Sequence, residues 1–116
     1  MSSIIGIGID VVAIDRFQES LDRTPGLLNR VFTSNEAKLK ISSLAARFAA
    51  KEALAKALNA KDSFNWQEAE VVSEESGKPN FKFTGEMAAR LANHNVHLTL
   101  SHDAGIASAM VIVEAI

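Results

Sequence analysis

Apolar and polar residues follow two different periodicities along the chain, and together they predict a mixed fold. Residues 4–12 form an apolar run rich in β-branched side chains, which is typical of a buried strand. Residues 96–101 alternate between apolar and polar side chains, as in a half-buried strand. Residues 106–114 carry apolar side chains on both faces. Because only the short segment 102–105 separates these last two strands, we expect them to form a hairpin with a loop over 102–105.

The strongest helix signal lies in the middle of the chain, at residues 43–58. Nearly all of these residues are good helix formers, and seven of them are alanine. At about 100° per residue, small residues occupy one side of this helix and large apolar residues occupy another. A helix that is apolar on two sides is expected at the centre of the fold. The charges that it carries therefore lie in or between apolar faces.

Shorter signals fill the rest of the chain. A helix is expected over 13–23 and ends at the breaker 24–26, and Thr33 and Glu36 form a capping-box pattern before a short helix. Strands are expected over 68–74 and 81–83, joined by a turn, and Thr84 can cap a helix that runs to about residue 93. The whole pattern predicts one α+β domain over 1–116. Its small, mainly antiparallel sheet packs on the long central helix.

Composition and charge narrow the function classes. The 116 residues have a formal net charge of −2, which argues against a generally basic nucleic-acid binder. The chain contains no cysteine, so a disulfide or a thiolate metal site is excluded, and a reducing cytoplasmic location fits. The apolar runs are too short to span a membrane, and the start of the chain lacks the features of a signal peptide.

Asp10, Glu52 and Lys56 are the first candidates for chemistry. Asp10 lies in an otherwise apolar strand, where a carboxylate is costly unless it is paired or binds a cation. Two carboxylates from separate elements, completed by the phosphates of a ligand, are typical of a magnesium site. The alternatives are a helix cap or local turn for Asp10, and a simple helical pair four residues apart for Glu52 and Lys56.

The loop and the glycines are less specific signals. His102 in an expected loop is either a functional histidine or an ordinary surface one. Gly6 and Gly8 lie on one face of a strand, which indicates close approach either by a ligand or by another backbone in the core. A dinucleotide fingerprint would need a third glycine where this chain has Val11. The sequence also contains no Walker loop.

Four motifs, taken in order, resemble one known family. They are GIGID at residues 6–10 with Arg16 shortly after, RFAAKEALAKAL at 47–58, SGKP at 76–79 and LSHD at 100–103. Their order and spacing resemble the holo-acyl-carrier-protein synthase group of phosphopantetheinyl transferases over almost the whole chain. This resemblance implies a phosphopantetheinyl-transferase-like fold that forms a homotrimer with active sites between subunits.

The resemblance also implies roles for individual residues. Asp10 and Glu52 would hold Mg²⁺ together with the pyrophosphate of coenzyme A, and Lys56 would face the same phosphates. Arg16 would meet acidic residues of an apo acyl carrier protein or carrier domain. A neighbouring subunit would contribute further contacts to coenzyme A. These are Gly77, Lys78, Pro79 and His102, with Asp103 as an additional candidate.

The implied reaction belongs to fatty acid biosynthesis in the cytoplasm. A serine of the carrier attacks the β-phosphate of coenzyme A, and 3′,5′-ADP leaves. Either Glu52 or a water would accept the serine proton. Arg47 and Lys51 are candidates for a carrier contact or for a structural ion pair.

One departure from the family pattern supports an alternative reading. The family commonly has a glycine-containing loop after the central helix, whereas this chain has Asn59 and the segment 60–62. Asn59 can still end a helix in a left-handed conformation. A non-catalytic module that binds coenzyme A or a carrier is therefore the alternative to the enzyme. A purely structural trimer with a buried ion network is a third hypothesis.

Overall fold

A computed structural model describes residues 3–60 and 62–116 of the protein. The chain begins with strand β1 (Ser3–Ala13), helices α1 (Ile14–Arg23) and α2 (Leu27–Val31) and the 3₁₀ turn η1 (Glu36–Lys38). The long helix α3 (Ile41–Leu58) follows, and then the 3₁₀ turn η2 (Trp66–Glu68). The remaining elements are strands β2 (Ala69–Ser73) and β3 (Pro79–Phe83), helix α4 (Gly85–Arg90), and strands β4 (His94–Asp103) and β5 (Ile106–Ala115).

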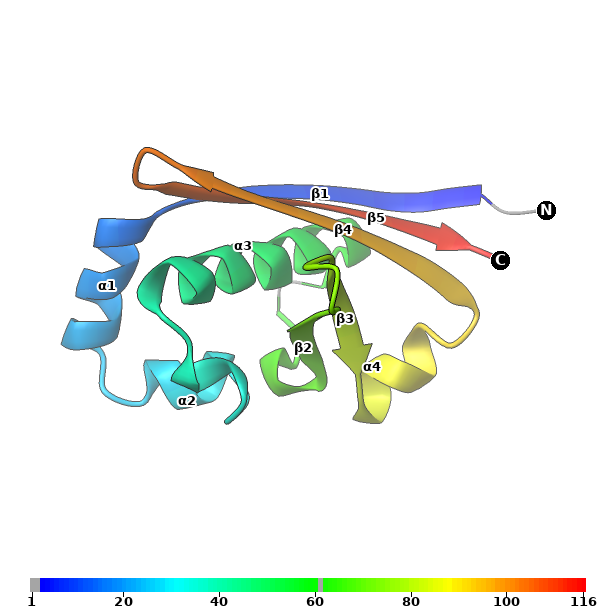
Figure 1. The fold of residues 1–116 in the computed structure, drawn as a ribbon. Helices are drawn as coiled ribbons and strands as arrows, with labels where there is room; N and C mark the ends of the chain where they lie inside the picture. The colour runs from blue at the N-terminus through cyan, green and yellow to red at the C-terminus, as the bar shows by residue number, and fades with distance from the viewer. Residues whose placement is uncertain (1–2, 61) are drawn as a thin grey trace.

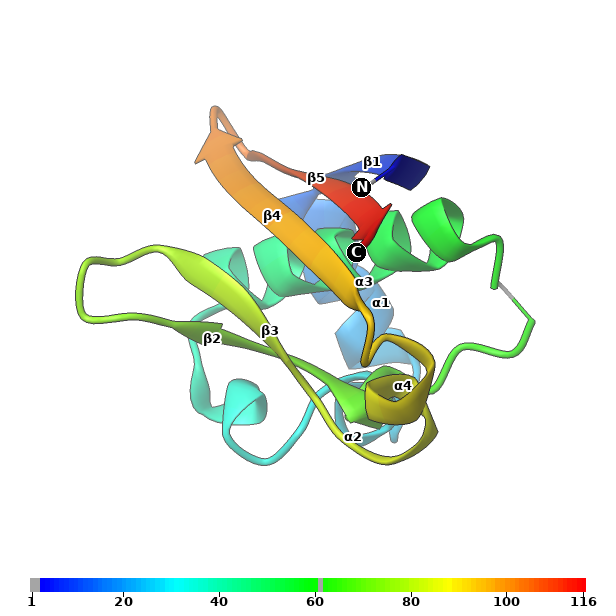
Figure 2. The same ribbon diagram turned by 90° about the vertical axis from the view of Figure 1, so that its right-hand side faces the viewer.

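Helix α3 lies between two layers, as its apolar pattern predicts (Figures 1 and 2). An antiparallel sheet with strand order β1-β5-β4 covers one side of the helix. The two-stranded β2–β3 sheet, α2 and α4 lie on the other side (Figure 1). The predicted α+β class with an antiparallel sheet packed on a long central helix is confirmed.

Two glycines of β1 allow α3 to approach the sheet closely. A Cβ atom added to Gly6 would overlap the carbonyl oxygen of Ala57, and one added to Gly8 would overlap that of Ala53. Any side chain at either position would therefore force the strand away from the helix. Of the two interpretations left open for these glycines, tight backbone packing in the core is the one that the structure confirms.

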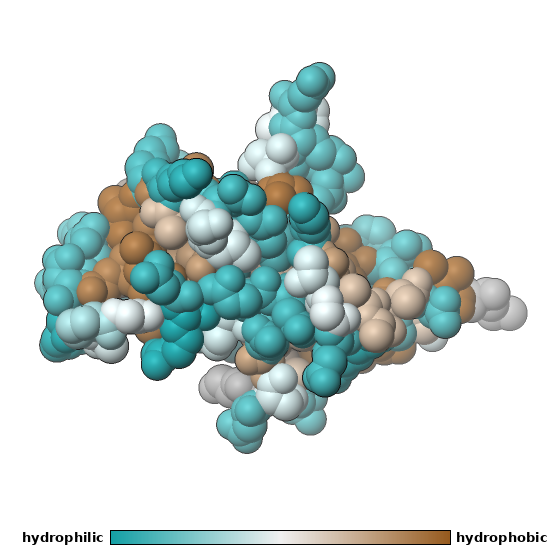
Figure 3. Space-filling model, turned by 90° about the horizontal axis from the view of Figure 1, so that it is seen from below, coloured by the Kyte–Doolittle hydropathy of each residue, from teal (hydrophilic) through white to brown (hydrophobic). Residues whose placement is uncertain are grey.

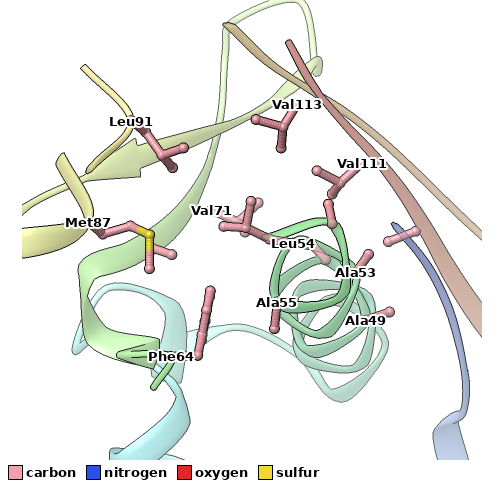
Figure 4. Close-up of a cluster of buried hydrophobic side chains, with 14 residues drawn as sticks. Ala49, Ala53, Leu54, Ala55, Phe64, Val71, Met87, Leu91, Val111 and Val113 are labelled. Atoms are coloured by element: carbon pink, nitrogen blue, oxygen red, sulfur yellow. The ribbon is translucent and has the colours of Figure 1, made fainter. Parts of the chain in front are cut away.

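The core forms on both sides of the alanine-rich helix. Val111 and Val113 of β5 face α3 from the sheet, while Phe64, Met87 and Leu91 pack from the opposite layer (Figure 4). A second cluster at the other end of the helix joins α1 and α2 to α3. It includes Phe17, Val31, Phe32 and Leu44. The two clusters fix both ends of α3.

The outer face of the three-stranded sheet is apolar and exposed along β1 and β5, whereas β4 presents polar residues there, among them His97 and Thr99. Ile7 and Ile9 of β1 are 57% and 59% exposed, and their register partners on β5 are Ile112 and Met110. Isolated exposed apolar side chains are ordinary, but a continuous patch indicates an interaction surface. By contrast, much of the opposite side of the molecule is hydrophilic, and a hydrophobic area lies at its left end in Figure 3.

The predicted loop over 102–105 is wrong, because the hairpin turn contains only Ala104 and Gly105. Both residues have positive φ angles, 51° and 79°, which suit the tight two-residue turns that match the twist of paired strands. His102 and Asp103 therefore belong to β4, where they pair with Ala107 and Ile106 of β5. His102 lies on the strand rather than in a loop.

The predicted caps gave two different outcomes. The capping box is confirmed, because Thr33 N–H donates to Glu36 Oε1 at 3.0 Å and Glu36 N–H donates to Thr33 Oγ1 at 3.3 Å. Only a single 3₁₀ turn follows it, since the chain becomes extended at Leu39. Thr84 occupies the N-cap position of α4 without a side-chain cap. Instead, Glu68 Oε1 accepts a hydrogen bond from Met87 N–H at 3.1 Å.

Candidate active site

Asp10 and Lys56 meet where β1 crosses the last turns of α3. Lys56 Nζ lies 3.0 Å from Asp10 Oδ1 and also donates to the carbonyl oxygen of Ile9 at 2.9 Å. The side chains of Lys56 and Asp10 are 43% and 18% exposed. The carboxylate in the apolar strand is thus paired with a cation, and both groups remain reachable by a ligand. A helix cap at Asp10 is not observed.

Glu52 lies one turn before Lys56 on α3 and shares a pocket with this pair. The pocket has a volume of about 410 Å³, and its walls also include Arg16 of α1. The structure thus brings together four residues that the sequence analysis selected from β1, α1 and α3. Since three of them come from separate elements, their convergence does not follow from helical spacing alone.

The two carboxylates fit a magnesium ion that is completed by substrate. Mg²⁺ prefers oxygen ligands, and it is usually held by one or two carboxylates together with phosphate oxygens and water. Asp10 and Glu52 line one pocket and supply such oxygens. Within residues 3–60 and 62–116, no group of three or more His, Cys, Asp or Glu side chains could hold a metal. Two carboxylates leave most coordination positions of such an ion to other ligands.

The residues predicted to bind coenzyme A from a neighbouring subunit form a second group. Gly77, Pro79 and His102 line a separate pocket of about 240 Å³, together with Arg47. Among the residues that line these two pockets in the described part of the chain, neither Lys78 nor Asp103 occurs. The selected residues thus divide into two groups that do not share a pocket within one chain.

Arg47 bridges α3 and β2 at this second pocket. Its Nε donates to the carbonyl oxygen of Val71 at 3.3 Å, and its guanidinium reaches Ser73 Oγ at 3.4 Å. Burial lowers the pKa of the Arg47 guanidinium, while the negative charges of Glu36 and Glu70 oppose this shift. Arg47 therefore ties the β2–β3 layer to the central helix.

Lys51 forms a structural ion pair, one of the two roles considered for it. Its ammonium lies 2.7 Å from Glu36 Oε1, and the two side chains are 0% and 1% exposed. Burial lowers the pKa of Lys51, and the hydrogen bond that its ammonium donates to Glu36 opposes that shift. Because the ammonium is buried, it cannot touch a carrier protein directly.

Two aromatic residues of the first pocket were missed in the sequence analysis. Phe17 and Phe48 line its wall, and their rings stack with centroids 4.8 Å apart. They lie in the two helices predicted over 13–23 and 43–58, where apolar side chains are expected to pack in the core. The available signal was the spacing of Phe48, which lies four residues before Glu52 and therefore on the same side of the helix.

Asn59 ends α3 in the left-handed conformation that the sequence analysis considered. Its φ and ψ angles are 51° and 45°, and its N–H donates to the carbonyl oxygen of Lys56 at 3.1 Å. Ala60, the next residue, is buried. Lys61, in the segment that departs from the family pattern, lies outside the described residues. Asparagine thus provides the helix stop that a glycine commonly gives.

The fold and the pocket define a small α+β protein with an Asp–Glu–Lys site between a strand and a central helix. Residues 6–109 match the family described as the 4′-phosphopantetheinyl transferase superfamily, and the chain belongs to this family. The holo-[acyl-carrier-protein] synthase of Streptomyces avermitilis is 55% identical over 121 residues, covering 97% of this chain and 98% of that protein. The predicted family and enzyme class are confirmed.

Solved structures agree with the sequence relatives. An ACPS–CoA complex from Chronobacterium ammoniagenes superimposes with a TM-score of 0.86 at 28% identity and covers 98% of both chains. A holo-(acyl-carrier-protein) synthase from Bacillus anthracis in complex with CoA (3′,5′-ADP) gives a TM-score of 0.81 at 32% identity. It covers 97% of this chain and 98% of that chain. Across the described residues of our protein, every helix is too short or too polar to cross a membrane.

Proposed function

We propose that the protein transfers the 4′-phosphopantetheine group of coenzyme A to a serine of an apo acyl carrier protein in the cytoplasm. The observation that carries this proposal is the pocket shared by Asp10, Glu52, Lys56 and Arg16. Two carboxylates and a lysine suit a pyrophosphate with its metal, and the family and its coenzyme A complexes support that ligand. The product released with the modified carrier is 3′,5′-ADP.

In this proposal, Asp10 and Glu52 hold Mg²⁺, which offsets the charge of the pyrophosphate oxygens when bound. The Asp10 carboxylate also keeps the Lys56 ammonium in place, as their 3.0 Å contact indicates. Lys56 stabilises the oxygen charge that grows as the leaving 3′,5′-ADP separates. Since phosphoryl transfer depends mainly on positioning and charge neutralisation, no covalent enzyme intermediate is required.

The atoms of the transfer balance as follows. The oxygen of the carrier serine forms a bond to the β-phosphorus of coenzyme A, and the bond from that phosphorus to the oxygen of 3′,5′-ADP breaks. The serine proton goes to Glu52, directly or through a water. Glu52 is the second carboxylate of the same pocket, which supports this role.

We further propose a homotrimer whose active sites lie between subunits. The first pocket of one subunit would face Gly77, Lys78, Pro79, His102 and Asp103 of its neighbour. Two observations support this arrangement. Asp10, Glu52 and Lys56 line one pocket of a chain, whereas Gly77, Pro79 and His102 line another. In addition, the outer face of the sheet exposes apolar side chains along β1 and β5. Burial of these side chains between subunits would remove them from water.

Arg16 is the proposed contact for the carrier protein. It lies on α1 at the rim of the first pocket, and the first turn of that helix also carries Asp15. A guanidinium can bind a carboxylate in a bidentate manner, so an acidic side chain of the carrier would be its partner. This contact would bring the carrier serine to the mouth of the pocket.

Release of 3′,5′-ADP separates the enzyme from a binding module. Apo carrier, coenzyme A and Mg²⁺ are incubated with the protein, and 3′,5′-ADP is quantified by chromatography, with a chelator in a parallel sample. We expect 3′,5′-ADP to form in proportion to the carrier supplied, and none to form in the sample with the chelator. Coenzyme A binding without ADP formation would instead support the non-catalytic alternative.

A further inference from the structure

We propose that the buried Lys51 is a positioning residue for carrier docking, acting through a stack of aromatic rings that fixes helix α1 beside the site. This inference rests on the proposed transfer to a carrier protein. It assigns a role to a charged side chain that lies outside both pockets. The contacts run from Lys51 to Trp66, then to Phe48 and Phe17, and Arg16 directly precedes Phe17 in the chain.

The Lys51 ammonium forms hydrogen bonds that connect three separate segments to α3. It donates to Glu36 Oε1 at 2.7 Å, to the carbonyl oxygen of Val31 at 2.8 Å and to that of Trp66 at 3.0 Å. An ammonium has three donors, so all three are used. The end of α2, η1 and η2 are therefore joined at one atom of the central helix.

Glu36 extends this network into the second layer. Its Oε1 also accepts from Thr33 N–H at 3.0 Å, while its Oε2 accepts from Val71 N–H of β2 at 2.8 Å. Both carboxylate oxygens are therefore occupied by protein donors. A fully satisfied buried network of this kind holds one arrangement of its segments in preference to others.

Lys51 binds the backbone of Trp66, and the side chain of Trp66 connects this contact to the first pocket. The indole of Trp66 stacks on Phe48 with a centroid separation of 5.7 Å and an interplanar angle of 14°. Phe48 in turn stacks on Phe17 at 4.8 Å. Phe48 and Phe17 both line the pocket that contains Asp10, Glu52 and Lys56. The last two rings of the stack thus form part of the pocket wall.

The last ring belongs to α1, which carries the proposed carrier contact. Phe17 is 5% exposed and directly follows Arg16, so its position determines where the guanidinium leaves the helix. If the Trp66 backbone moved, Phe48 and Phe17 would repack, and Arg16 would shift against the Asp10–Lys56 pair. Small errors of placement are costly, since a displacement of about 1 Å can reduce turnover by about a hundredfold.

Stability alone does not account for a buried charge at this position. Apolar residues of similar volume often replace a buried ion pair without loss of stability, because they avoid the cost of desolvation. The network instead fixes the positions of three backbone segments, a geometry that an apolar pair would not specify. If Lys51 positions the docking surface, variants that remain folded should still bind the carrier more weakly.

The test compares three variants with the wild-type protein. Lys51→Met with Glu36→Gln removes both charges together, and Trp66→Leu removes the indole while leaving the carbonyl that Lys51 binds. Phe64→Leu is the matched control, because the Phe64 ring also contacts Trp66, at 5.1 Å, but leads into the other core cluster. Each protein is assayed for unfolding free energy, for kcat, and for KM toward coenzyme A and toward apo carrier.

A direct binding readout is available because the chain contains a single tryptophan, Trp66. Its emission is followed while apo carrier is added, and fluorescence anisotropy of a labelled carrier gives Kd independently of turnover. We expect the wild-type emission to shift when the carrier binds. In the Lys51→Met/Glu36→Gln protein we expect no shift of the Trp66 emission and a higher Kd for the carrier.

For Lys51→Met/Glu36→Gln and for Trp66→Leu, called here the stack variants, we expect kcat/KM for the carrier to fall by about tenfold to a hundredfold. Most of this fall should come from a higher KM. KM for coenzyme A should stay within about twofold of wild type, since neither variant touches the pyrophosphate site. A folded stack variant with wild-type Kd and KM for the carrier overturns the inference, and so does an equal defect in Phe64→Leu. Wild-type protein that transfers nothing contradicts the proposed function instead, and wild-type protein that binds no carrier overturns both.

Discussion

Lys56 Nζ lies 3.0 Å from Asp10 Oδ1, so a helix cation and a strand carboxylate close one side of the same pocket. The two residues are 46 positions apart in the chain, and the pair forms only because β1 packs directly on α3. This contact is partly exposed, and exposed ion pairs contribute about 0–1 kcal/mol to stability. The pair is thus better suited to binding phosphate than to holding the fold together.

Lys56→Met therefore separates catalysis from stability. We expect turnover to fall by about a hundredfold to a thousandfold, as when a charge-stabilising group is removed from an active site. The unfolding free energy should change by less than about 1 kcal/mol, because the pair is partly solvated. Steady-state kinetics and urea denaturation measure the two effects. Lys40→Met, at an exposed position before α3, is the control and should change neither quantity. A Lys56→Met protein with wild-type turnover would contradict the assigned role.

Gly8→Ala tests the close packing of β1 on α3. The new Cβ would overlap the carbonyl oxygen of Ala53, so the strand must move. We expect a loss of about 1–3 kcal/mol or more, as for overpacked cores, and a fall in Tm of about 4 °C for each kcal/mol. Thermal unfolding followed by circular dichroism gives both values.

Gly26→Ala is the matched control for this strand variant. Gly26 has a φ of 88° but no atom within 4 Å of an added Cβ, so only backbone strain is introduced. That strain costs about 1–2 kcal/mol. If Gly8→Ala costs no more than a few tenths of a kcal/mol, less than the strain at Gly26, β1 does not depend on close approach to the helix.

Mixed subunits test whether an active site takes residues from two chains. Asp10→Asn and His102→Ala proteins are each expected to lose most of their activity. When they are unfolded and refolded together, some interfaces would combine an intact Asp10 from one chain with an intact His102 from the next. We expect activity to return in the mixture, measured as phosphopantetheine transfer.

The control for this mixture uses two defects on the same side of the site. Asp10→Asn and Lys56→Met both alter the first pocket, so their mixture should remain inactive. Sedimentation measurements verify that subunits exchange. If the Asp10→Asn and His102→Ala mixture also stays inactive despite exchange, the site is not shared between chains.

The lowered pKa of Lys51 predicts how stability depends on pH. Burial places the folded pKa below the ordinary value of 10.5, so the folded protein loses this proton at lower pH than the unfolded chain does. Between the two pKa values the unfolded state binds more protons, and the contribution of Lys51 to unfolding free energy therefore rises with pH. We expect the stability difference between wild type and Lys51→Met to grow in favour of wild type as pH approaches 10.5. A decrease over that window would contradict the assigned shift.

Local signals in the sequence predict most of the fold. The apolar periodicity of β1, α3, β4 and β5 is strong because each packs against a continuous partner surface. By contrast, α2 spans only five residues and η2 only three, and neither was expected. Such short elements are held by tertiary contacts, including the Lys51 hydrogen bonds to Val31 and Trp66, which no local pattern reveals.

The candidate site was predictable in part for similar reasons. Asp10 was conspicuous because a charge interrupts an apolar strand, and the motif order suggested its companions. The partner of Asp10 could not be chosen by spacing, since Glu52 and Lys56 also suit an ordinary helical pair. Phe17 belongs to an apolar core cluster and Phe48 packs against it, and both also line the pocket. Apolar periodicity alone therefore does not distinguish them from other core residues.

The most direct test of the account is intact-mass analysis of an apo carrier protein after incubation with this protein, coenzyme A and Mg²⁺. We expect the carrier to gain the mass of one phosphopantetheine. The gain should disappear with a chelator and with Asp10→Asn, and should persist with Asp15→Asn on the exposed face of α1. An unmodified carrier with the wild-type protein, despite bound coenzyme A, would contradict the proposed transfer. A gain that persists in Asp10→Asn would contradict the assignment of the site.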